Sequence, residues 1–184
     1  MDIHGFSSDL EYIPEGSTLL LDGNSFVWYI CEQVTLYHNN IKNDRRYGGD
    51  YVALDEMAKR ELQRLQSDLG FTVIVFFDGP QSSFKGDASA RRRKMNLDTW
   101  YKFHRLIHGS TSVELDDLPI PLLAVEQFQQ TLTDINGNPA NKSIRIIQSK
   151  YEATKDMAVA CVKGNRNNEA NGNPRRLYCC SGDT

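Results

Sequence analysis

Cysteine is scarce in this chain, and its spacing excludes the common cysteine-based sites. Only four of the 184 residues are cysteines, none forms a C-x-x-C pair, and the last two are adjacent. This spacing supports neither a zinc site nor a disulfide framework. Reduced, mostly buried thiols are therefore expected. The four are Cys31, Cys161, Cys179 and Cys180.

Long apolar runs and several familiar motifs are also lacking. No stretch approaches the roughly 20 apolar residues that span a bilayer, so no membrane partner is expected. Residues 1–14 carry three acids and no apolar core of a signal peptide, which predicts an intracellular protein. A Gly-rich phosphate loop, a dinucleotide fingerprint and a nucleophile elbow are all absent from the sequence.

The whole chain has no surplus of positive charge, although one segment does. Its 21 Lys and Arg face 24 Asp and Glu, a net charge of −3, so a nucleic-acid partner would need a local basic patch. Residues 85–105 hold seven basic and two acidic side chains interleaved with aromatics. Such a run is typical either of phosphate contact or of a solvated helix face. Its basic members are Lys85, Arg91, Arg92, Arg93, Lys94, Lys102 and Arg105.

What the sequence does contain is an alternation of strand and helix patterns. Apolar runs predict strands over residues 18–21, 71–77, 143–147 and 177–180. The first two runs are almost continuous, which is typical of strands buried on both faces of a parallel sheet. The alternation predicts one α/β domain over residues 1–184, with a mostly parallel sheet flanked by helices.

Helices are predicted between these strands, and polar stretches predict loops. Apolar residues at three- and four-residue steps indicate a helix over residues 54–69, which Gly70 would end. Two further helices are expected, one after Asn24 and one from about Tyr151. Stretches rich in Asn and Gly at residues 133–142 and 164–174 predict loops.

Acidic side chains follow the predicted strands. Asp22, Asp78 and Asp183 each come at a strand end or after a short turn, and Glu152 begins the helix after the third strand. Ligands of parallel sheets bind at the carboxyl ends of the strands, and carboxylates gathered there repel one another unless a cation neutralises them. Hard oxygen ligands suit Mg²⁺ or Mn²⁺, and two such ions can support phosphodiester cleavage. For any one acid alone, a helix N-cap is the alternative.

Five segments together resemble motifs of the FEN/XPG nuclease superfamily, and the Asteroid-type XPG-domain proteins are the most similar branch. The opening of the chain resembles the start of these proteins, and the remaining segments resemble their acidic motifs in the same order. The segments are Met1 to Phe6, Leu20 to Ser25, Val75 to Gly79, Tyr151 to Ala158 and Ser181 to Thr184.

The resemblance implies a PIN-like, three-layer α/β/α fold and a nuclear, structure-specific nuclease that cleaves DNA flaps or junctions, or RNA. It implies that Asp22, Asp78, Glu152 and Asp183 are ligands of two Mg²⁺ or Mn²⁺ ions. Lys85 and Arg92 fall seven and fourteen residues after Asp78, where such nucleases contact the scissile phosphate. The neighbouring Arg91, Arg93 and Lys94 would extend this nucleic-acid contact.

The sequence departs from the family pattern in ways that keep other functions open. Thr154 stands where a second acid is usual, with Asp156 as a further candidate ligand one helical turn from Glu152. The end at Thr184, before the second Asp of the last motif, predicts a truncated domain. A catalytically weak or inactive module that binds nucleic acid or protein is the main alternative. A Mg²⁺-dependent phosphotransferase ranks last, because Asn24 stands where its Asp-x-Asp motif needs an acid.

Overall fold

The computed structural model describes residues 14–37, 49–80, 94, 97–98, 101, 104–105 and 120–182. Its four strands form one sheet in which every neighbouring pair is parallel, in the order β3-β2-β1-β4. All four predicted strands are confirmed, with ends that move by at most two residues. They are β1 (Thr18–Asp22), β2 (Thr72–Phe77), β3 (Arg145–Gln148) and β4 (Leu177–Cys180).

The two central strands are the most apolar and the most buried. Leu19, Leu20 and Leu21 of β1 are each at most 5% exposed, and Val73 and Val75 of β2 are fully buried. The outer strands β3 and β4 are largely half-buried or exposed. The continuous apolar runs thus correctly indicated strands covered on both faces.

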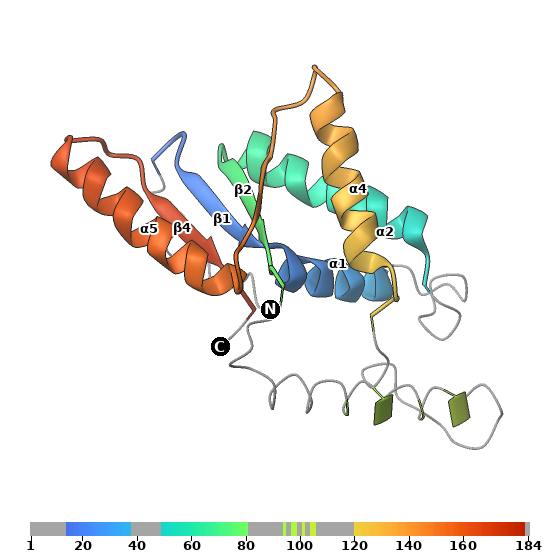
Figure 1. Ribbon diagram of the computed structural model, residues 1–184. Helices are drawn as coiled ribbons and strands as arrows, with labels where there is room; N and C mark the ends of the chain where they lie inside the picture. Colours follow the sequence, from blue (N-terminus) through green and yellow to red (C-terminus); the bar gives the residue numbers. More distant parts are fainter. Residues whose placement is uncertain are drawn as a thin grey trace.

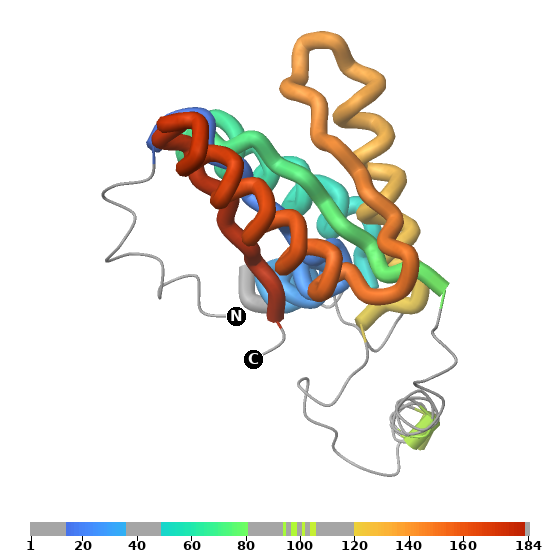
Figure 2. The backbone as a smooth tube through the Cα atoms, turned by 60° about the vertical axis from the view of Figure 1, so that its left-hand side comes forward, coloured from blue at the N-terminus to red at the C-terminus, as the bar shows by residue number. Residues whose placement is uncertain are grey.

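Helices cover both faces of the sheet, as the three-layer prediction requires (Figure 1). Helices α1, α2 and α4 pack on one face, and α5 packs on the other, mainly over β4 and β1 (Figure 2). A π-helical turn continues α2 and ends before Gly70, whose φ of 69° suits the predicted stop. The helices are α1 (Gly23–Tyr37), α2 (Tyr51–Gln63), α4 (Ala124–Gly137) and α5 (Ala153–Ala170), and the π-helical turn is Arg64–Asp68.

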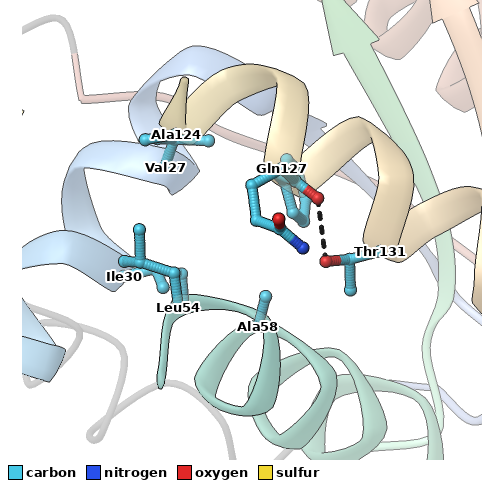
Figure 3. A pocket seen from close by; sticks show the side chains of 8 residues that line it. Val27, Ile30, Leu54, Ala58, Ala124, Gln127 and Thr131 are labelled. Atoms are coloured by element: carbon cyan, nitrogen blue, oxygen red, sulfur yellow. Dashed lines mark hydrogen bonds between the residues drawn. The ribbon is translucent and has the colours of Figure 1, made fainter. Parts of the chain in front are cut away.

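The core is split unequally between the two faces. The larger cluster joins alternate side chains of β1 and β2 to α1, α2 and α4, whereas the smaller one joins Leu20 and Phe76 to Ala153 and Met157 of α5. A cavity of about 10 Å³ lies between α1, α2 and α4 (Figure 3). It has room for about one water molecule, so it is a packing gap and not a ligand site.

Two predicted loops are in part helical. Helix α4 reaches Gly137, so residues 133–137 are not a loop, and this helix was not predicted at all. Helix α5 reaches Ala170, so most of residues 164–174 is helical as well. In both places Asn and Gly have poor helix propensity, and tertiary contacts of the two helices outweigh it.

The prediction that the cysteines form no disulfides is confirmed, and the prediction that most of them are buried is wrong. All four cysteines are free thiols, but only Cys31 is buried, and Cys179 is exposed. In the part of the chain that the structure describes, no helix is long and apolar enough to cross a membrane.

Candidate site at the carboxyl edge of the sheet

Asp22 and Asp78 lie at the carboxyl ends of the two central strands. Asp22 is the last residue of β1, and Asp78 directly follows the last residue of β2. Because β1 and β2 are parallel neighbours, with Asp22 opposite Phe76, both carboxylates are delivered to the same edge of the sheet. This is the lower edge in Figure 1, where α1 and α5 also begin.

Asp22 is buried and bonded to both flanking helices. Only 5% of the residue is exposed. Its Oδ1 accepts from the backbone N–H of Ser25 at 3.0 Å, in the first turn of α1. Its Oδ2 accepts from the hydroxyl of Thr154 at 3.3 Å, in the first turn of α5. The carboxylate therefore sits where two helix starts concentrate backbone N–H groups, an environment that favours negative charge.

Asp78 is exposed and makes the same kind of connection. Its Oδ1 accepts from the backbone N–H of Ala153 at 2.8 Å, the first residue of α5. Its Oδ2 accepts from the side-chain amide of Asn24 at 2.9 Å, near the start of α1. Asp78 thus caps α5 from a different segment of the chain, while its exposure leaves it accessible to a ligand.

The glycine after each acid permits these close approaches. A Cβ on Gly23 would collide with the ring of Phe77, and a Cβ on Gly79 would collide with the carbonyl oxygens of Ser149 and Lys150. The N–H of Gly79 also donates to the carbonyl of Tyr151 at 2.9 Å. The glycine of each Asp-Gly pair is therefore required for packing at this edge, and each pair is also part of a predicted motif.

Two acids at the start of α5, Glu152 and Asp156, are close in sequence to Ala153 and Thr154, which bond the two aspartates. Glu152 is the N-cap residue of α5, and its Oε2 pairs with Nζ of Lys155 at 3.0 Å. Asp156 is exposed in the first turn of the helix, where its N–H donates to the carbonyl of Glu152 at 3.4 Å.

The described residues supply only part of the predicted ligand set. Among them, no group of three or more Asp, Glu, His or Cys side chains is close enough to hold a metal ion. Asp183, Lys85 and residues 91–93 lie outside the described residues. Lys94 is among the described residues; it is helical, and it is exposed. Of the predicted ligands, Asp22 and Asp78 are therefore the two that the structure brings together most clearly, because both bond to the first residues of α5.

The sequence reading missed the donors that hold these carboxylates. Asn24 was interpreted as a helix cap and as the absent acid of a phosphotransferase motif, and Thr154 as the absent acid of the nuclease motif. Each donates to one of the two aspartates. For Asn24 the sequence does offer a signal, since its amide side chain comes two residues after an acid at a strand end. The sequence offers no such signal for Thr154, because its contact with Asp22 depends on how α5 packs against β1.

The site also changes the chemistry of a neighbouring thiol. Burial, followed by the negative charge of Asp22, raises the pKa of Cys180 above its usual range. Cys180 lies opposite Leu21 in β4, one residue before the end of β1. This thiol therefore stays protonated at neutral pH and is not a nucleophile of the site.

No protein-family model matches this chain, and no curated protein matches it.

Proposed function

We propose that the chain is the core of a divalent-metal-dependent nuclease, with Asp22 and Asp78 as the central metal ligands. The observation that carries this proposal is the delivery of both carboxylates to one sheet edge by adjacent parallel strands. Ligands of α/β sheets bind at that edge, and hard carboxylate oxygens suit Mg²⁺ or Mn²⁺. The order of the acidic motifs adds support from the resemblance to FEN/XPG nucleases.

The donor chemistry fits divalent ions of this kind at Asp22 and Asp78. Each of their oxygens accepts one protein hydrogen bond, and a carboxylate oxygen has a second lone pair for a cation. Glu152 and Asp183 would complete the set, with Asp156 as a further candidate. When bound, such ions would supply Lewis acidity for phosphodiester hydrolysis.

The chain's own residues would hold the acids and the substrate. Asn24 and Thr154 orient the two carboxylates, and the start of α5 keeps Asp78 in place. Lys85 and Arg92 would contact the scissile phosphate, with Arg91, Arg93 and Lys94 on the flanking backbone. The substrate would be a DNA flap or junction, or RNA, and the proposed location is the nucleus.

A non-catalytic module that binds nucleic acid or protein is the second candidate. The specific observation in its favour is that both carboxylates are already satisfied by the fold and that the described residues hold no metal-binding group of three. In this reading Asp22 and Asp78 serve only to fix α1 and α5 to the sheet.

The deciding experiment replaces Asp78 by Asn and measures cleavage of labelled flap, junction and single-stranded substrates. Asn keeps the size of the side chain and can still accept from Ala153, but it removes the charge. With Mg²⁺ or Mn²⁺ we expect cleavage by the wild type, and a loss of about 100-fold or more in the variant. Chelator should abolish the activity of both.

The matched control is Asp68→Asn, which removes an exposed carboxylate from the π-helical turn after α2. It should cleave like the wild type. Equal cleavage by Asp78→Asn and wild type would reject the nuclease proposal. Salt-sensitive binding without any cleavage would favour the binding module.

A further inference from the structure

The loop between β3 and α5, residues 149–152, is fixed beside Asp78. The N–H of Ser149 donates to the carbonyl of Phe77 at 2.9 Å, and the N–H of Gly79 donates to the carbonyl of Tyr151 at 2.9 Å. The side chain of Gln148 also donates to the backbone carbonyl of Asp78. The backbone of this loop therefore keeps a defined position relative to the candidate site.

This loop presents an aromatic ring to solvent. Tyr151 is 48% exposed, whereas the phenylalanines of the described core are at most 6% exposed. Tyr151 belongs to neither core cluster, so its ring contributes little to folding. Nζ of Lys150 lies 5.2 Å from the centre of this ring, a cation–π distance. One ring thus stands next to the site with a cation beside it.

An exposed aromatic with an adjacent cation fits single-stranded nucleic acid. Every base has a π-face that can stack on such a ring, and the cation can contact a flanking phosphate. Bases in a duplex are already stacked and do not offer these faces. Lys155 is also exposed nearby, in the first turn of α5, but its charge is already paired with Glu152.

We propose that Tyr151 is a stacking platform for one base of a single-stranded nucleic acid and that Lys150 contacts the adjoining phosphate. This inference rests on the proposed function, because it places the strand beside Asp78. It gives the site a substrate class, an unpaired strand, that the acids alone do not specify.

Binding to two fluorescein-labelled 12-mers in the presence of chelator tests the platform. One oligomer carries bases, and the other has the same phosphates with abasic sugars. Tyr151→Ala should weaken binding of the first about tenfold and leave the second unchanged, whereas Tyr151→Phe should bind both like the wild type. Equal affinities of Tyr151→Ala and wild type for the first oligomer, or equal losses for both oligomers, would overturn the platform.

The phosphate contact has its own readout. Lys150→Ala should reduce the slope of log K against log salt concentration by about 0.7, the value of one phosphate contact to a single strand. Lys163→Ala is the control, because Lys163 is an exposed lysine further along α5. An unchanged slope in Lys150→Ala would remove this lysine from the proposal. Circular dichroism spectra identical to the wild type would establish that the variants are folded.

The binding assay separates this inference from the nuclease proposal because it needs no cleavage. Base-dependent binding through Tyr151 without cleavage in Mg²⁺ would keep the platform and reject the nuclease. Cleavage by a protein whose Tyr151→Ala variant binds normally would keep the nuclease and reject the platform. A wild type that binds neither oligomer would reject the platform outright.

Discussion

Asp22 and Asp78 use their carboxylate oxygens both to join the helices to the sheet and, in our proposal, to hold a cation. Each accepts from α1 with one oxygen and from α5 with the other. Replacing a carboxylate by a group that cannot accept would therefore destabilise the edge as well as remove charge. This is why the amide, and not alanine, is the informative substitution at both positions.

Thr154 illustrates how one side chain alters the charge of the site. Its hydroxyl donates to Asp22, so it supports that carboxylate without adding a negative charge. An acid at this position would face Asp22 across the same short distance and would need a cation between them. Thr154 therefore gives this edge one negative charge fewer than an acid at the same position would.

The thiol of Cys179 gives a prediction at the same scale. Burial of the sulfur, followed by its hydrogen bond with Cys161, raises the pKa of Cys179 to about 12. Although the residue is exposed, it should be almost fully protonated at pH 8, and its alkylation rate should keep rising with pH up to about 12. Mass spectrometry of iodoacetamide labelling from pH 7 to pH 11 measures this. A rate that levels off near pH 9, as for an ordinary thiol, would show that burial and the hydrogen bond with Cys161 do not raise this pKa.

Among the elements, the apolar strands were predicted best, whereas helix α4 and the end of helix α5 were missed. The runs of β1 and β2 indicate buried parallel strands without reference to any other segment. The acids at their ends were predicted for the same reason, since position after a strand fixes the edge. Helix α4 was missed although the sequence carries a signal for it, because its buried apolar residues recur at three- and four-residue steps: Ala124, Phe128, Leu132 and Ile135.

Helix α5 continues through an Asn-rich segment because asparagines in it bind the next strand. The amide of Asn165 accepts from the N–H of Leu177 at 2.8 Å and donates to its carbonyl at 3.0 Å. On the other face of the sheet, Asn136 of α4 bonds both backbone groups of Ile144 in the same way. Asparagines that look like loop residues in sequence are therefore links between helices and edge strands.

This link gives a prediction at the element scale. Asn165→Ala leaves the partly buried N–H of Leu177 without its acceptor and removes one of two donors to its carbonyl, the other being the thiol of Cys161. This loss should lower the free energy of unfolding by about 1–3 kcal/mol. Urea unfolding followed by circular dichroism measures the change. Asn167→Ala, an exposed substitution two residues further along α5, should change stability by less than about 0.5 kcal/mol. Equal stabilities for the two variants would show that the link to β4 is energetically unimportant.

At the scale of the whole molecule, the unequal layers leave a single helix, α5, to contact both aspartates from its face of the sheet. Three helices share one face of the sheet, whereas α5 covers the other face and brings Ala153, Thr154 and the adjacent Glu152 to the strand ends (Figures 1 and 2). The seating of α5 therefore controls the geometry around both aspartates. A ligand that bridges strand ends and α5 should stabilise the whole fold.

Thermal unfolding with and without divalent ions tests this coupling. Mg²⁺ or Mn²⁺ at 100 times its dissociation constant would stabilise the folded state by about 2.7 kcal/mol. For a domain of this length that corresponds to a rise in Tm of about 5–10 °C. We expect this rise in the wild type and in Asp68→Asn, and its loss in Asp22→Asn and in Asp78→Asn. Sodium chloride at the same ionic strength should not reproduce it. An equal rise in all four proteins would mean that the ions act elsewhere, and no rise in the wild type would mean that the carboxyl edge does not hold a metal.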